Sequence, residues 1–106
     1  MSISWIYLIA AILFEVSGTT CMKLSQGFTK IVPSVLIFVF YGLCFTFLTL
    51  ALKRLEVSVA YSVWAGLGTI LIAIIGIIWF RESATFIKLI SIALIIIGVI
   101  GINASQ

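Results

Sequence analysis

Four apolar runs of 19 to 24 residues dominate this chain of 106 residues and restrict what it can fold into. They extend over Ser4–Met22, Ile31–Leu52, Val57–Phe80 and Ala84–Asn103. Because an α-helix rises about 1.5 Å per residue, a run of this length crosses a hydrocarbon core of about 30 Å. Only 8% of the residues are charged, against about 25% in soluble domains. The predicted fold is therefore all-α: a single integral membrane domain over residues 1–106 with four transmembrane helices.

The few charged side chains fall almost entirely between these runs. They collect in Lys23–Lys30, Lys53–Glu56 and Arg81–Ser83. Of the two exceptions, Lys88 is close enough to a helix end to extend its ammonium group toward water, whereas Glu15 is not. The first and third segments, together with Lys88, place four Lys and Arg residues on one membrane face, and the second places two on the other. Since orientation follows the excess of Lys and Arg, this weak bias permits insertion in both directions.

Composition argues against several classes of function. The net charge is +3, but six cations spread singly along the chain make no surface that could follow a nucleic-acid backbone. The chain has no histidine, and Cys21 and Cys44 lack the spacing of metal ligands. We expect both cysteines to be small packing residues. No nucleophile–base pair or phosphate-binding loop is present, so we expect no enzyme, no metal and no cofactor.

Glu15 is the residue that most directly indicates a function. A carboxylate near the middle of a membrane helix is costly to keep charged, and such residues usually mark ion or substrate pathways. No basic residue lies deep in any run to neutralise it, so its partner has to be a proton or an external cation. Burial favours the protonated form, which lets the carboxyl group take up and release protons. The alternative is a neutral glutamic acid that only hydrogen-bonds between helices.

Small and polar residues share the helix face that carries Glu15. Ala11, Gly18, Thr19 and Met22 lie at helical spacings from it. The small side chains let another helix or a ligand approach the carboxylate, and the Thr19 hydroxyl can donate a hydrogen bond. We therefore predict that Ala11, Gly18 and Thr19 line a site around Glu15.

The third run contributes aromatic residues and glycines. Tyr61 and Trp64 offer a phenol donor and π faces, which suit an organic cation held beside a carboxylate. Anchoring at the membrane–water interface is the alternative role for these two rings. Gly66 and Gly68 loosen the helix and permit a kink, although close packing alone would also account for them.

The fourth run indicates association with a second copy. Ser91 and Gly98 present small residues at heptad-like spacing, which suits helix–helix contact and predicts dimer packing. Four helices cannot enclose a cavity that opens alternately to both sides, and secondary transporters commonly use inverted repeats around a central site. This chain has no internal duplication, so an inverted homodimer would supply the second half. Two Glu15 carboxyl groups would then share one site and bind protons as a coupled pair.

Several different sequence motifs follow one another in a specific order along the whole chain. They are Phe14–Thr20, Met22–Lys23, Ser25–Lys30, Pro33–Ser34, Ala60–Gly68 and Gly98. In this order and at these separations they resemble the small multidrug resistance family. The resemblance implies a four-helix subunit that forms an antiparallel, dual-topology homodimer in the bacterial inner membrane. It also implies export of cationic compounds, such as quaternary ammonium compounds, drugs and dyes, in exchange for protons.

The resemblance further implies roles for individual residues. Glu15 of both subunits would bind protons and substrate in turn, and Tyr61 and Trp64 would line the site. Tyr41 falls where the drug exporters of that family have a site-lining tyrosine, and Thr19 falls where a site threonine lies. The partners implied are small organic cations, protons, the lipid bilayer and a second copy of the chain.

Three departures from the family pattern concern the substrate. Cys44 stands where a serine usually contacts the glutamate, and Thr46 stands where an aromatic residue often sits in the drug exporters. Gly18–Thr19 resembles the polyspecific exporters of quaternary ammonium compounds. Arg81–Glu82 instead resembles a loop of the guanidinium exporters, although Ser83 replaces a proline. A guanidinium–proton exporter, or one half of a heterodimeric pair, is therefore the alternative. A non-transporting assembly subunit and a small cation channel are the rival classes.

Overall fold

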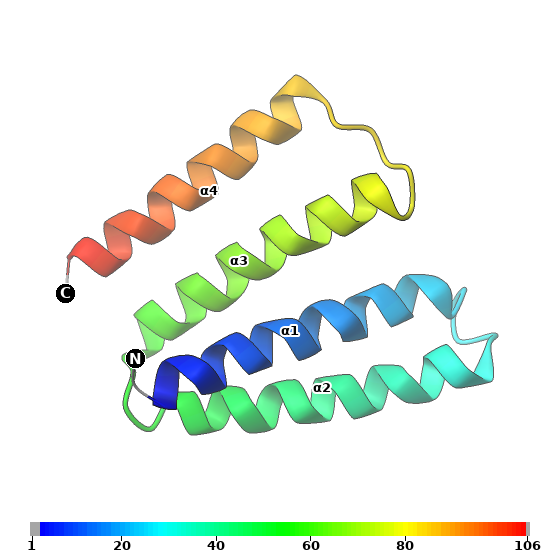
Figure 1. The fold of residues 1–106 in the computed structure, drawn as a ribbon, viewed down its shortest axis with the longest axis horizontal. Coiled ribbons are helices and arrows are strands. Elements are labelled where there is room, and N and C mark those ends of the chain that lie inside the picture. Colours follow the sequence, from blue (N-terminus) through cyan, green and yellow to red (C-terminus); the bar gives the residue numbers. More distant parts are fainter. Residues whose placement is uncertain (1–2, 106) are drawn as a thin grey trace. The chain divides into compact units, whose positions relative to one another are not determined.

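The computed structural model describes residues 3–105, which are helical apart from three short connections and the last residue (Figure 1). The helices are α1 (Ile3–Leu24), α2 (Ile31–Ala51), α3 (Val57–Ile78) and α4 (Phe86–Ala104). Each is long and apolar enough to cross a membrane, with a mean hydropathy between 1.5 and 2.4. The prediction of an all-α chain with four long apolar helices is confirmed.

The helices pack as two antiparallel pairs, and each pair is a compact unit. One unit runs to Leu55 and contains α1 and α2, and the other begins at Glu56 and contains α3 and α4 (Figure 1). The short connections force neighbouring helices to run in opposite directions, because they are too short to carry the chain back across the bilayer. That the whole chain forms a single membrane domain over residues 1–106 stays a prediction.

The connection between α1 and α2 is organised by one serine. The Ser25 hydroxyl donates a hydrogen bond to the Met22 carbonyl over 2.8 Å and accepts one from the Phe28 amide over 3.2 Å. Three successive residues, Gln26 to Phe28, have positive φ angles of 48°, 72° and 67°. This left-handed turn reverses the chain within a few residues, and glycine at its centre lowers the strain.

The connection before α4 accommodates a charged side chain. Thr85 caps the helix by accepting a hydrogen bond from the Lys88 amide over 3.1 Å. The Lys88 ammonium group donates to the Ser83 carbonyl over 2.7 Å. Lys88 thus lies in the first turn of α4 with its charge directed back to the loop, as its position near a helix end predicts.

Aromatic rings and one glycine hold α1 against α2. Phe14 stacks between two rings of α2, with centroid distances of 6.2 Å to Phe40 and 5.6 Å to Phe47. Four residues after Phe14, Gly18 leaves room for the ring of Tyr41. A Cβ atom at Gly18 would lie 2.8 Å from Tyr41 Cε2 and 2.9 Å from Cδ2. The absence of a side chain at Gly18 therefore brings Tyr41 onto the surface of α1.

The α3–α4 pair also packs closely at a glycine, but it buries far fewer side chains than the α1–α2 pair. A Cβ atom at Gly66 would lie 2.6 Å from Val99 Cγ2, so Gly66 permits close packing while α3 remains helical. No residue of α4 is buried, and its apolar side chains lie open on most of the helix surface. Such a surface requires lipid or another protein chain to cover it.

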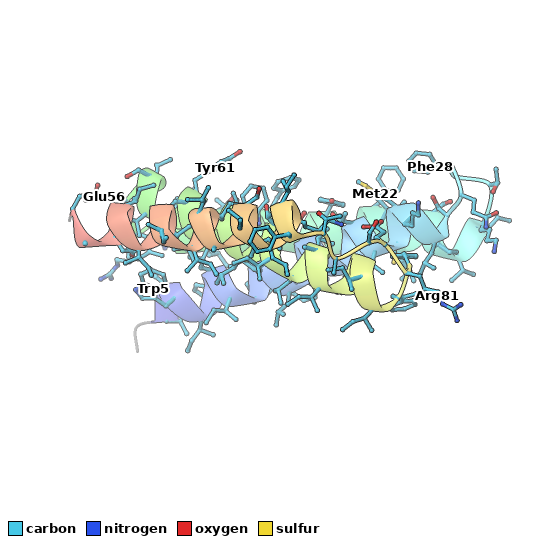
Figure 2. All side chains as sticks on the ribbon, turned by 90° about the horizontal axis from the view of Figure 1, so that it is seen from above. Trp5, Met22, Phe28, Glu56, Tyr61 and Arg81 are labelled. Carbon is cyan, nitrogen blue, oxygen red and sulfur yellow. The ribbon has the colours of Figure 1, made fainter. Side chains whose placement is uncertain are left out.

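Figure 2 shows how side chains mark the ends of each unit. In the first unit, Trp5 lies near the start of α1, and Met22 and Phe28 lie toward its other end. Phe28 stacks on Phe38 of α2 at a centroid distance of 6.3 Å. Tryptophan and other aromatic residues at the ends of membrane helices suit the boundary between lipid and water.

We predict that Gly18→Ala destabilises the protein by about 1–2 kcal/mol, because the added methyl group overlaps the Tyr41 ring. The free energy of unfolding can be measured by circular dichroism in mixed detergent micelles. Gly42→Ala is the matched control, since a Cβ atom at Gly42 meets nothing within 4 Å. Equal loss in the two variants would contradict the packing role of Gly18.

Candidate functional site

Glu15 lies near the middle of α1 and is half-buried. It is the only acidic residue within the four helices, because Glu56 precedes α3 and Glu82 lies in the loop before α4. A carboxylate at this depth needs polar partners, since hydrocarbon offers none. The neighbouring hydroxyl groups supply them.

Two hydroxyl groups connect Glu15 to the second helix. The Thr19 hydroxyl donates a hydrogen bond to Glu15 Oε1 over 3.0 Å. Thr19 Oγ1 also lies 2.5 Å from the Tyr41 hydroxyl of α2. The helical spacing of four residues places Thr19 directly beside Glu15, and Gly18 lets Tyr41 reach it. The three side chains form a continuous chain, which we call the Glu15–Thr19–Tyr41 relay.

Counting hydrogens fixes the direction of this relay. Each hydroxyl group has a single hydrogen to donate. When Thr19 gives its hydrogen to Glu15, the hydrogen between Thr19 and Tyr41 has to come from Tyr41. The Tyr41 hydroxyl also lies 3.9 Å from Met22 Sδ, a weak acceptor. Tyr41 can thus direct its hydrogen either toward Thr19 or toward Met22, but not toward both.

The remaining predicted residues of the first unit surround this relay. Ala11 lies one turn before Glu15 and is fully buried, and Gly18 is buried beneath Tyr41. Cys44 lies one turn after Tyr41 on α2 and is also fully buried. Because these three residues are small, no bulky side chain projects from the helix surface at their positions.

The two aromatic residues predicted for the site lie on α3, in the second unit. The rings of Tyr61 and Trp64 meet edge to face, with centroids 5.3 Å apart. Tyr61 is 58% exposed (Figure 2). The indole nitrogen of Trp64 is enclosed and has no hydrogen-bond partner among residues 3–105. A buried N–H group without an acceptor is uncommon in proteins, so Trp64 has a donor to offer to a further group.

The other predicted residues occupy varied positions. Gly66 and Gly68 are buried along α3, and their predicted role in a kink stays a prediction. Ser91 and Gly98 are exposed on α4, and nothing lies within 4 Å of a Cβ atom placed at Gly98. Within residues 3–105, no cluster of three or more potential metal ligands is present.

Sequence reasoning from the residues themselves missed two features of the structure. The contact between Thr19 and Tyr41 joins two helices, and helical spacing gives no register between different helices. The Glu82 carboxylate lies against Gly76 of α3, and the Glu82 amide donates to the Gly76 carbonyl over 2.9 Å. The motif around Arg81 drew attention to this loop but gave no sign that it folds back on the helix.

Comparison with known proteins identifies relatives over the whole chain. The family model described as Small Multidrug Resistance protein matches residues 3–95. The chain is 54% identical over 100 residues to the uncharacterized membrane protein YvaE of Bacillus subtilis (strain 168), covering 94% of this chain and 84% of that protein.

Two further relatives have names that describe resistance. The quaternary ammonium compound-resistance protein QacG of Staphylococcus sp. (strain ST94) is 43% identical over 99 residues, covering 93% of this chain and 92% of that protein. The multidrug resistance protein EbrA of Bacillus licheniformis is 39% identical over 105 residues, covering 99% and 100% of the two chains.

We predict that Thr19→Val destabilises the protein by about 1 kcal/mol, because it removes the hydroxyl that joins Glu15 to Tyr41. Thr20→Val is the matched control in the next position. Its hydroxyl donates only to the Val16 carbonyl within the same helix over 2.8 Å, so its loss should change stability by less than about 0.5 kcal/mol. Chemical unfolding in mixed micelles measures both, and equal effects would argue against the relay.

Proposed function

Because the chain belongs to the small multidrug resistance family, we propose that it is a proton-coupled antiporter that exports hydrophobic organic cations. Its substrates in this proposal are quaternary ammonium compounds and cationic drugs and dyes. The observation that carries the proposal is the single intramembrane carboxylate, Glu15, with its relay of hydroxyl groups. The names of two relatives, which describe resistance to quaternary ammonium compounds and to multiple drugs, support the choice of substrate.

The exchange step follows from the chemistry of one carboxylate site. A proton and an organic cation both neutralise Glu15, so they compete for it. The charged site without either ligand is costly in a low-dielectric environment. Conversion between inward- and outward-facing forms is therefore favoured when a ligand is bound, which couples export of a cation to entry of protons.

The relay gives the two states of Glu15 different hydrogen-bond patterns. The ionised carboxylate accepts from Thr19, and Tyr41 then donates to Thr19. A protonated Glu15 can donate to Thr19 instead. Thr19 would then donate to Tyr41, and Tyr41 would turn its hydrogen toward Met22. In this proposal a change in the protonation of Glu15 changes the hydrogen-bond direction at Tyr41 on α2. Each of the three side chains keeps at least one hydrogen bond in both patterns.

The aromatic residues of α3 complete the proposed site. Tyr61 and Trp64 present π faces, to which cations without N–H groups are attracted. The unpartnered indole N–H of Trp64 is a donor of the kind that a carboxylate accepts. These properties support their assignment to the binding of an organic cation together with Glu15.

We further propose that the active form is an antiparallel homodimer with both copies contributing Glu15. The exposed apolar surface of α4 supports a second copy. The weak difference in Lys and Arg between the two faces supports opposite insertion of the copies. Pairing of the two halves around a central site is the general arrangement of secondary transporters.

We predict that Glu15→Gln abolishes proton-driven transport while the protein still folds and inserts. Glutamine keeps the hydrogen-bonding shape of the side chain but cannot exchange a proton. The measurement is proton-coupled current from reconstituted protein on solid-supported membranes. Glu56→Gln makes the same chemical change at an exposed position before α3 and should leave the current unchanged. Sustained uptake driven by a pH gradient in Glu15→Gln would overturn the mechanism.

The same currents identify the substrate class. A tetra-substituted phosphonium or ammonium ion should produce current, and guanidinium should produce little. Current with guanidinium alone would assign the chain to the guanidinium exporters. No current from folded protein with any of these cations would indicate that a partner subunit is required.

We predict that Gly98→Ile weakens the homodimer about tenfold, or by about 1.4 kcal/mol, because it fills the surface through which small residues permit helix contact. Dissociation can be followed by energy transfer between labelled copies as they are diluted in liposomes. Ala93→Ile is the control, since Ala93 is also exposed but projects from another side of α4. Equal weakening by both variants, or none by Gly98→Ile, would exclude this contact surface.

A further inference from the structure

A cavity of about 360 Å³ lies at the end of the first unit where α1 begins and α2 ends. This size falls within the range of ligand pockets, about 300–1,000 Å³. Its walls come from the two helices and the turn that follows α2. The lining residues are Ile3, Ser4, Tyr7, Leu50, Lys53 and Arg54. The cavity is separate from Glu15, which lies several turns away along α1.

Two cations line this cavity without a negative partner. No acidic residue is among the lining side chains. Neither Lys53 nor Arg54 forms an ion pair with any of residues 3–105. Backbone hydrogen bonds from Lys53 to Leu50 and from Arg54 to Ala51, both 3.3 Å long, hold the turn that carries them. The pair therefore forms a fixed positive charge that a mobile anion can neutralise.

Ser4 adds a polar group deeper in the cavity. Its side chain lines the cavity and is only 2% exposed. Further along α1, the Ser17 hydroxyl donates to the carbonyl of Leu13, four residues earlier. Ser4 is the second residue of α1 and has no such carbonyl within the described helix. A ligand that can accept the hydrogen of the Ser4 hydroxyl would therefore suit this wall of the cavity.

The remaining walls come from Tyr7 and two aliphatic side chains. Ile3 and Leu50 face the same space as the two cations. Both lie at the end of a membrane-crossing helix, where headgroups of the bilayer meet its hydrocarbon. A ligand that fills this cavity thus needs an anionic group beside an apolar chain. Basic pockets between membrane helices typically bind anionic lipid headgroups in this way.

We propose that this cavity binds the headgroup of an anionic glycerophospholipid. Its phosphate oxygens accept hydrogen bonds from Lys53, Arg54 and Ser4, and its acyl chains lie along Ile3 and Leu50. A phospholipid with a positively charged headgroup is disfavoured, because the added ammonium group repels the two cations. The site is independent of proton and substrate binding at Glu15.

The test measures lipid retention by native mass spectrometry of purified protein released from nanodiscs of phosphatidylglycerol and phosphatidylcholine. The unmodified protein should retain phosphatidylglycerol in preference to phosphatidylcholine. A hydrogen bond from each of the two lining cations to the phosphate contributes about fivefold or more, so the double variant Lys53→Gln/Arg54→Gln should lose about 25-fold of this preference. The matched control is Lys23→Gln/Lys30→Gln, which removes the same charge from the other connection of the same unit. Neither lysine lines the cavity, so this variant should change retention less than about twofold.

Two further measurements distinguish binding in the cavity from unspecific attraction of anionic lipids to a positively charged protein. Ser4→Ala should reduce phosphatidylglycerol retention about two- to threefold without changing the net charge. Inorganic phosphate in large excess should not displace the lipid, because it makes no contact with the apolar walls. Equal losses in the two double variants, full retention in Lys53→Gln/Arg54→Gln, or displacement by inorganic phosphate would each overturn the proposal. Circular dichroism of every variant establishes that the protein remains folded.

Discussion

The need to provide partners for one carboxylate inside hydrocarbon determines how α1 and α2 pack. The only basic residue of α1, Lys23, lies in its last turn and not beside Glu15, so hydroxyl groups supply the polar partners of the carboxylate. Thr19 reaches Glu15 because four residues separate them on one helix, and Tyr41 reaches Thr19 because Gly18 has no side chain. The position of Tyr41 beside Thr19 thus depends on Gly18, and the contact of Thr19 with Glu15 depends on the helical spacing. A close contact between α1 and α2 thus lies beside the only carboxyl group of these two helices.

The second unit, formed by α3 and α4, has neither the buried α4 residues nor the intramembrane carboxylate that would hold its helices together. No residue of α4 is buried, and the four helices contain one carboxylate in total, on α1. Membrane helices gain little by leaving water, so close packing and hydrogen bonds have to hold them together. Gly66 gives α3 and α4 one such close contact, against Val99. The remaining exposed surface of α4 is then available to lipid or to a second copy, as the proposed homodimer requires.

Sequence alone predicted the features that depend on spacing within one helix. The four helices follow from the length of the apolar runs, and the grouping of Ala11, Gly18 and Thr19 with Glu15 follows from the helical repeat. Tyr41 entered only through the family resemblance, since no periodicity relates α1 to α2. The turn at Gln26–Phe28 was equally hard to foresee, because two of its three positive φ angles belong to residues other than glycine. Contacts between helices and strained turns depend on packing that a single sequence does not encode locally.

The proposed lipid site affects the proposed dual topology, because both depend on the positive charges at the membrane faces. Lys53 and Arg54 are the cations of the face that carries fewer of them. In an antiparallel dimer, one copy would present its cavity to the inner leaflet and the other to the outer leaflet. The surface potential that attracts basic groups is strongest at the cytoplasmic leaflet, so the two cavities would be filled unequally even though their sequences are identical. An anionic headgroup at Lys53 and Arg54 would hold this face at the cytoplasmic side and oppose the preference set by the four cations of the other face. The weak orientation preference set by the charges of the two faces would then be reduced by lipid binding, which favours a population with both orientations.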